Sequence, residues 1–186
     1  MKSQNKKLQI GVMGPAASEY SQDVQTRAMV CSFAEKIGEL LAEQNVIVFT
    51  GGMDGVMELA SKGAKNKGGV TVGTPGRIRG MSNKYIDIEV LTPIDVGDFL
   101  FAGILSCDAI ITIPGGAGTL AEVCIAYRNK KPNIIIEGIN PDYDKFINNY
   151  LDESNLIITY GAKTPEEAVE KAIGLAKQQI HHSNSL

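Results

Sequence analysis

One stretch of the sequence decides the fold: Ala109-Ile110-Ile111-Thr112-Ile113-Pro114-Gly115-Gly116-Ala117-Gly118-Thr119-Leu120-Ala121-Glu122. Its first five residues form an apolar run typical of a buried strand, and a helix is predicted from Leu120 to Arg128. The glycine-rich turn between them leaves backbone N–H groups without partners at the start of that helix. With the positive end of the helix dipole, these donors favour an anion such as phosphate. Glu122 follows Thr119 by three residues and Gly118 by four, so a carboxylate shares one helical face with the loop.

The position of Glu122 also predicts its charge. A helix N-terminus favours the ionised carboxylate, which suits hydrogen bonding to a ligand or stabilisation of positive charge better than general acid chemistry. A purely structural role, as a capping glutamate in the first helical turn, is the alternative.

Apolar runs alternate with helical patterns along the rest of the chain. Because the strands are continuously apolar, they predict a parallel sheet buried on both faces. We therefore expect a single doubly wound, Rossmann-like α/β domain over residues 1–186, with about six or seven mostly parallel strands and frayed ends at residues 1–7 and 181–186. The other predicted strands are Leu8–Met13, Val46–Thr50, Val70–Thr74, Ile86–Leu91, Asn133–Ile136 and Leu156–Thr159; the other predicted helices are residues 22–43, 54–67 with Asp54 as N-cap, 93–106, 143–150 and 164–179 with Thr164 as N-cap.

Composition and charge exclude several classes of protein. The chain has 186 residues, of which 44% are hydrophobic and 21% charged, as in ordinary globular domains. Its net charge is −3, and neither end is strongly basic, so we expect no nucleic-acid partner. The cysteines Cys31, Cys107 and Cys124 are isolated, which predicts reduced thiols and neither a disulfide framework nor a zinc site. With no signal-peptide pattern and no apolar run of about 18 residues, we expect a cytoplasmic protein that does not enter a membrane.

Two more glycine-rich loops follow predicted strands. Gly14 lies in the loop of residues 11–18, and Gly51 and Gly52 lie in the loop of residues 50–55. Each loop alone is also compatible with a tight turn that binds nothing. Because ligands of parallel sheets bind at the carboxyl ends of the strands, the three loops together favour a phosphate-bearing ligand. Neither G-x-G-x-x-G nor a Gly-Lys-Ser/Thr sequence follows a strand, which argues against a dinucleotide site or a P-loop of the usual kind.

The run from Pro114 to Glu122 has the P-G-G-x-G-T-x-x-E signature, and in this it resembles the Lonely Guy-like superfamily. That superfamily contains cytokinin-activating nucleotide phosphoribohydrolases and the molybdenum-cofactor carrier proteins. Residues 51–64, 68–75 and 107–110 are similar to further blocks of the carrier-like branch. The resemblance thus spans about residues 9–132, and it implies a homodimer or a higher homo-oligomer.

This resemblance implies two alternative functions. The first is a binding protein for a phosphate-bearing cofactor, either of the molybdopterin type or a nucleoside monophosphate. Backbone N–H groups of Gly115, Gly116, Gly118 and Thr119 then hold the phosphate, the loops with Gly14, Gly51 and Gly52 border the ligand, and Glu122 anchors its ring or sugar. The second is a nucleoside 5′-monophosphate phosphoribohydrolase that releases a free base and ribose 5-phosphate, with Glu122 as the catalytic residue. No metal site is predicted for either, because His181 and His182 have no ligand partners at suitable spacing.

One departure from the superfamily pattern bears on this choice. Where the phosphoribohydrolases carry an Arg-Lys pair before the signature loop, this sequence has Phe99 and Leu100. A phenylalanine cannot bind phosphate, so the departure favours binding over catalysis. Arg77 or Arg79 could replace the missing arginine, unless they belong to a solvated basic loop. A DNA-processing relative of the same broad fold is disfavoured, because no basic stripe with interleaved aromatic residues is present.

Overall fold

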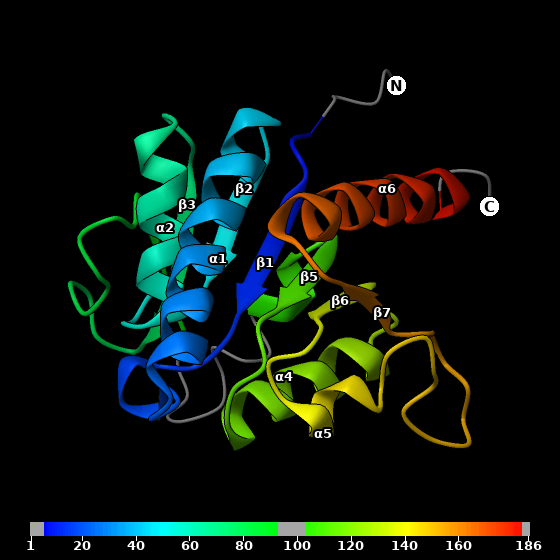
Figure 1. The fold of residues 1–186 in the computed structure, drawn as a ribbon. Coiled ribbons are helices and arrows are strands. Elements are labelled where there is room, and N and C mark those ends of the chain that lie inside the picture. Colours follow the sequence, from blue (N-terminus) through cyan, green and yellow to red (C-terminus); the bar gives the residue numbers. More distant parts are fainter. Residues whose placement is uncertain (1–5, 93–102, 184–186) are drawn as a thin grey trace, which may run out of the picture.

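The computed structural model describes residues 6–92 and 103–183, and its strands form one parallel sheet (Figure 1). The sheet has seven strands in the order β4-β3-β2-β1-β5-β6-β7, and each neighbouring pair is parallel. This confirms the predicted doubly wound, Rossmann-like architecture. The strands are β1 (Gln9–Met13), β2 (Ile47–Thr50), β3 (Thr71–Gly76), β4 (Ile88–Leu91), β5 (Ala109–Thr112), β6 (Asn133–Ile136) and β7 (Tyr160–Ala162).

Helices cover both faces of the sheet (Figure 1). The long helices α1 (Val24–Glu43), α2 (Val56–Asn66) and α6 (Pro165–Ser183) lie on one face. On the other face lie α4 (Ala117–Arg128) and α5 (Pro141–Asp144), and a short 3₁₀ helix, η1 (Ala17–Glu19), precedes α1. Residues 103–106 are helical, but the start of the helix predicted from Pro93 lies outside the described residues. None of the described helices has an apolar stretch long enough to cross a membrane.

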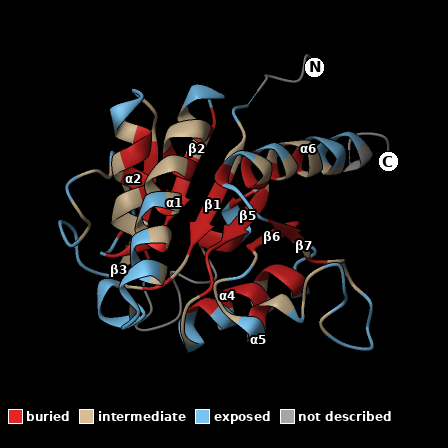
Figure 2. Cartoon of the chain, in the orientation of Figure 1, coloured by how far each residue is buried: buried red, intermediate tan, exposed pale blue. Residues whose placement is uncertain are grey.

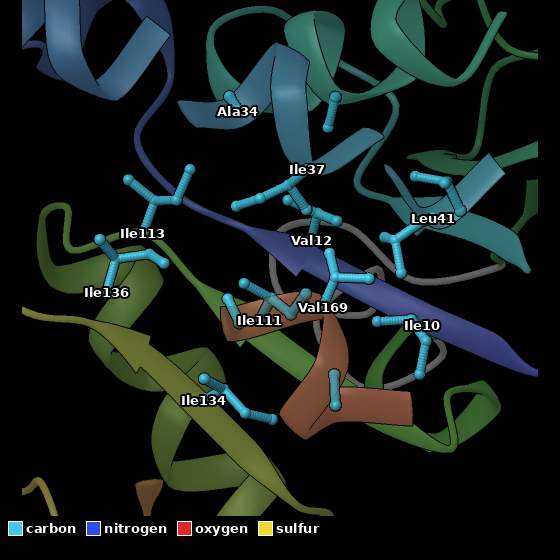
Figure 3. Packing of buried hydrophobic residues seen from close by; sticks show 14 of the residues in the cluster. Ile10, Val12, Ala34, Ile37, Leu41, Ile111, Ile113, Ile134, Ile136 and Val169 are labelled. Carbon is cyan, nitrogen blue, oxygen red and sulfur yellow. The ribbon is translucent and has the colours of Figure 1, made fainter. Parts of the chain in front are cut away.

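The core has two layers because successive side chains of a strand point to opposite faces. Ile111 and Ile134 pack with α1 and α6, whereas Ile110 and Ile135 belong to the clusters on the α4 side. Figure 3 shows Ile37 and Leu41 of α1 and Val169 of α6 against the isoleucines of the sheet. Figure 2 shows the result: the central strands are buried, and exposed residues lie mainly on the outer faces of the helices and in the loops.

The last strand was predicted four residues too early, at Leu156–Thr159. The ladder with β6 begins only at Tyr160, which pairs with Ile134. Thr159 instead exchanges backbone hydrogen bonds with Asn148 and Asn149 of the preceding loop (2.7 and 3.0 Å). The apolar residues before it therefore belong to a folded loop and not to the sheet.

Three predicted helix boundaries also differ. Helix α2 is capped by Gly55, which has a φ of +68°, and not by Asp54. Helix α5 begins earlier than predicted, at Pro141, and ends at Asp144. Helix α6 starts after Thr164 as predicted, but it continues to Ser183, past the point where a frayed tail was expected.

Helices α1 and α2 approach each other closely at two glycines. A Cβ atom added to Gly38 of α1 would lie 1.9 Å from the carbonyl oxygen of Ala60, and one added to Gly63 of α2 would lie 1.9 Å from that of Glu35. Only hydrogen fits in either place, so both glycines are there for packing. This contact holds the two helices that follow the first and second glycine loops in a fixed relation.

We therefore expect Gly38→Ala to lower the free energy of unfolding by about 3 kcal/mol or more, because backbone atoms must move to admit the methyl group. Urea unfolding of the variant measures the loss. Ser32→Ala, at an exposed position of the same helix, is the control and should stay within about 0.5 kcal/mol of the wild type. Equal stability of Gly38→Ala and the wild type would contradict this close approach.

Candidate ligand site at the sheet switch point

The strand order reverses between β1 and β5, and two of the glycine-rich loops leave the sheet there. From β1 the chain turns toward α1 on one face, and from β5 it turns into α4 on the other (Figure 1). The two loops stay in register for one more residue, since the N–H of Ile113 donates to the carbonyl of Met13 at 2.8 Å. In open α/β sheets this divergence creates the crevice in which ligands bind.

The signature loop forms the first turn of α4. The helix begins at Ala117 with Gly116 as N-cap, earlier than the predicted start at Leu120. Gly116 has no side chain with which to cap the helix, so the first N–H groups of α4 have no capping oxygen from the N-cap residue. A Cβ added to Gly118 would meet nothing within 4 Å, so the second residue of the helix faces open space.

Gly115 makes the loop compact. A Cβ at this position would lie 2.6 Å from the Thr119 hydroxyl oxygen and 3.0 Å from the backbone nitrogen of Pro15. The Thr119 side chain is thereby held beneath the loop, where it is only 3% exposed. Of the four predicted phosphate-binding residues, Gly118 is the one with open space beside it, and the others form the turn that presents it.

The first loop brings a carboxylate to the signature loop. Glu19 ends η1, and its Oε2 accepts a hydrogen bond from the N–H of Ala16 (3.2 Å). Its Oε1 lies 3.0 Å from the position that a Cβ of Gly116 would occupy. Gly14 has a different neighbour, because a Cβ there would lie 2.8 Å from Cγ1 of Val56. The absent side chain at Gly14 thus admits α2, and only the backbone of this residue is available to border a ligand.

The second loop packs against the first. The N–H of Val56 donates to the carbonyl of Pro15 (3.0 Å), and Oδ1 of Asp54 accepts from the N–H of Ala17 (3.0 Å). A Cβ at Gly55 would lie 2.5 Å from the Pro15 carbonyl oxygen, so the loops touch through their backbones. The three loops singled out from the sequence therefore lie together at the carboxyl ends of the central strands.

Gly51 and Gly52 are buried at the end of β2. Gly52 has a φ of +80°, which favours glycine, and its N–H donates to Oγ1 of Thr50 at 3.0 Å. Asn83, from the loop after β3, holds the turn in place. Its side-chain nitrogen donates to the carbonyls of Gly52 and Met53 (3.0 and 2.7 Å).

Glu122 is buried in the second turn of α4, with 8% of its surface exposed. Burial, and secondly the negative charge of Glu19, raise the pKa of Glu122 to about 8. The carboxyl group is thus mostly neutral at pH 7, contrary to the expectation from the helix dipole. The reason is its position, because the dipole acts within the first turn, and Glu122 is the sixth residue of a helix that starts at Ala117. The capping role in a first turn is excluded for the same reason.

Tyr143 is a contact of the loop that sequence reasoning missed. It lies in α5, and its hydroxyl donates to the carbonyl of Gly116 at 3.0 Å. Burial raises the pKa of Tyr143 to about 12, so the hydroxyl keeps its proton and remains a donor. No local pattern links Tyr143 to the signature loop, because the contact exists only when β6 places α5 beside α4.

The two arginines that could replace the missing arginine of the superfamily pattern do not follow β1 or β5. Arg77 and Arg79 are exposed in the loop after β3, and β2 and β1 separate this strand from β5. Arg79 interacts with Glu89. Phe99 and Leu100 lie outside the described residues. Within residues 6–92 and 103–183, no three acidic, histidine or cysteine side chains gather as they would around a metal ion.

Comparison with known proteins finds relatives in both sequence and structure. An uncharacterized protein of Archaeoglobus fulgidus is 37% identical over 141 residues, which cover 72% of this chain and 87% of that protein. The molybdenum cofactor binding protein of Rippkaea orientalis has a similar structure, with a TM-score of 0.78, 30% identity and coverage of 92% of this chain and 99% of that one. The molybdenum cofactor carrier protein of Chlamydomonas reinhardtii matches with a TM-score of 0.77 and 28% identity, covering 91% and 98%. The SLOG cluster4 family model matches residues 7–169, and the chain therefore belongs to the SLOG cluster4 family.

Proposed function

We propose that this protein binds a phosphate-bearing cofactor of the molybdopterin type and acts as its carrier. The observation that carries the proposal is the N-terminus of α4, which starts at a glycine N-cap, lies at the switch point of the sheet and has open space at Gly118. The similarity to molybdenum cofactor binding and carrier proteins over nine tenths of the chain supports the same ligand class.

The phosphate in this proposal lies at the start of α4. Backbone N–H groups of Gly115, Gly116, Gly118 and Thr119 supply the donors, and the positive end of the helix dipole adds to them. The carboxylate of Glu19 beside Gly116 limits how much negative charge this end of the crevice tolerates. The phosphate therefore belongs on the Gly118 side of the loop, away from Glu19.

Glu122 anchors the ring of the ligand. A neutral carboxyl group offers one donor and one acceptor side by side. This pair matches the adjacent N–H and C=O groups of a pterin-like ring, which an ionised carboxylate, with acceptors only, would match less well. The burial that keeps Glu122 neutral is thus part of the recognition.

The alternative, a nucleoside 5′-monophosphate phosphoribohydrolase, receives less support. Catalysis of that reaction by the signature glutamate is expected to need a cation nearby, whereas the neighbour that shifts the pKa of Glu122 is the carboxylate of Glu19.

We place the protein in the cytoplasm, since its free cysteines fit a reducing compartment. We also propose that residues 1–186 form one domain, because a single sheet extends from β1 to β7.

A charged side chain at Gly118 tests the phosphate position. The site has space for it, so Gly118→Glu should fold normally and lower the affinity for molybdopterin about tenfold or more, because it places a negative charge where the phosphate is expected. Gly118→Gln has nearly the same volume without the charge and should bind more tightly than Gly118→Glu. Purified protein is incubated anaerobically with molybdopterin released from a molybdoenzyme, and bound pterin is measured by fluorescence after gel filtration.

Equal binding of molybdopterin by the wild type and Gly118→Glu would contradict the phosphate position at the start of α4. Two results would overturn the carrier proposal itself. One is no binding of molybdopterin by the wild type. The other is release of a free base from any of a panel of nucleoside 5′-monophosphates, lost in Glu122→Gln, because that would make the protein a phosphoribohydrolase.

The pKa of Glu122 makes stability depend on pH. Between its ordinary value of 4.5 and about 8, the folded protein holds a proton on Glu122 that the unfolded chain has lost. The free energy of unfolding should therefore fall as the pH rises through this window. Glu122→Gln, which mimics the neutral form, should match the wild type at pH 4.5 and be the more stable of the two at pH 8.5. Urea unfolding at a series of pH values, with the exposed Glu153→Gln as control, measures the difference; parallel curves for the wild type and Glu122→Gln would contradict the neutral state.

A further inference from the structure

Two carboxyl groups lie near Gly116 of the signature loop. Oε1 of Glu19 is 3.0 Å from the position that a Cβ of this glycine would occupy, and Tyr143 donates to its carbonyl. Burial raises the pKa of Tyr143, and the charges of Glu122 and Glu19 raise it further. The two glutamates therefore lie close to the same part of the loop, and neither comes within 4 Å of the Cβ position at Gly118.

Both carboxyl groups have unused hydrogen-bonding capacity. Glu122 is only 8% exposed, yet none of the described residues donates a hydrogen bond to it or forms an ion pair with it. Oε2 of Glu19 accepts from the N–H of Ala16 at 3.2 Å, but Oε1, which is turned toward Gly116, accepts from no group in residues 6–92 and 103–183. Because folded proteins rarely leave buried polar groups unpaired, we expect a ligand to supply the missing partners.

The position of Glu19 is fixed by the fold. Its N–H donates to the carbonyl of Ala16 at 2.9 Å, which closes the short helix η1. The next residue in η1, Ala17, is held against the second loop, since its N–H donates to Oδ1 of Asp54 at 3.0 Å. The free oxygen of Glu19 is therefore held in one place before a ligand arrives, unlike that of a glutamate in a solvated loop.

The ring contact proposed for Glu122 determines which ligand group comes next to it, and the following inference rests on that proposed function. In a pterin-like ring, the N–H and C=O groups that match a neutral carboxyl group are followed, on the N–H side, by the 2-amino group. The edge of the ring thus presents donor, donor and acceptor in a row. An ionised glutamate offers acceptors only, so it matches the first donor of this row.

We infer that Glu19 is a specificity-determining residue, which accepts a hydrogen bond from the 2-amino group and selects a 2-amino-4-oxo ring over its 2,4-dioxo analogue. In the analogue, a carbonyl oxygen replaces the amino group. Two acceptors then face each other, so no hydrogen bond forms and their partial charges repel. Two carboxyl groups with no paired cation among the described residues require a ligand edge that carries donors.

Two fluorescent probes test this specificity, the phosphate esters of 6-hydroxymethylpterin and 6-hydroxymethyllumazine, which differ in the group at C2. Titrations at pH 6.5, below the pKa of about 8 of Glu122, measure their dissociation constants. The wild type should bind the pterin ester about tenfold or more tightly than the lumazine ester. Glu19→Gln should bind both within about threefold of each other, because a carboxamide can accept from an amino group or donate to a carbonyl.

The ratio of the two dissociation constants separates recognition from a structural role. The carboxamide oxygen of Glu19→Gln can still accept from the N–H of Ala16, and a damaged fold would weaken both esters alike. Glu153→Gln, the same substitution at an exposed position outside the three glycine loops, should keep the ratio of the wild type.

Equal binding of the two esters by the wild type would overturn the role of Glu19 and leave the carrier proposal intact. A Glu19→Gln variant with the ratio of the wild type would do the same, because another group would then read the ring. Binding of neither ester by a wild type that binds molybdopterin would also overturn it. If molybdopterin itself does not bind, the proposed function fails and this inference fails with it.

Discussion

The parallel pairing of β1 with β5 is the constraint on which the candidate site depends. The register from Ile10 with Ala109 to Met13 with Thr112 brings together two loops that are far apart in the sequence. Both strands are buried, so their hydrogen bonds are shielded from water and the pairing cannot slip without exposing the core. The chain leaves the two strands toward opposite faces of the sheet, and in open α/β sheets this is where ligands bind. Without this pairing, the glycines of the signature loop would form only a turn.

At this candidate site, burial and the helix dipole have opposite effects on the charge of Glu122. The dipole acts over the first turn of a helix, whereas desolvation acts wherever water is excluded. Because α4 starts at Ala117, Glu122 lies beyond the first turn, where the dipole acts, but it is buried and therefore desolvated. The nearby Glu19 adds to the penalty for ionisation. A shift of only a few residues in the helix start therefore changes the chemistry that this side chain can perform.

The sequence predicted those elements whose cause is local. The apolar run of β6 has the predicted bounds, and the hydroxyl of Thr164 accepts from the N–H of Glu167 at 3.2 Å as expected of an N-cap. Predictions from local patterns were wrong where tertiary contacts determine the structure. Glycines have low helix propensity, so the start of α4 was placed too late. The apolar residues before Thr159 resemble a strand in the sequence. Only the tertiary structure shows that the pairing with β6 begins later, at Tyr160. The contact of Tyr143 with the signature loop depends on the relative positions of α4, β6 and α5, which no local pattern shows.

Glycine has two distinct roles in this fold, and they separate the parts that must stay rigid from the parts that must stay open. At Gly38 and Gly63 the missing side chain lets two helices touch, and these contacts fix the scaffold behind the first and second loops. At Gly118 nothing lies within 4 Å of the place a Cβ would take, so the absent side chain leaves room for a ligand. This opening is at the positive end of a helix and suits an anion.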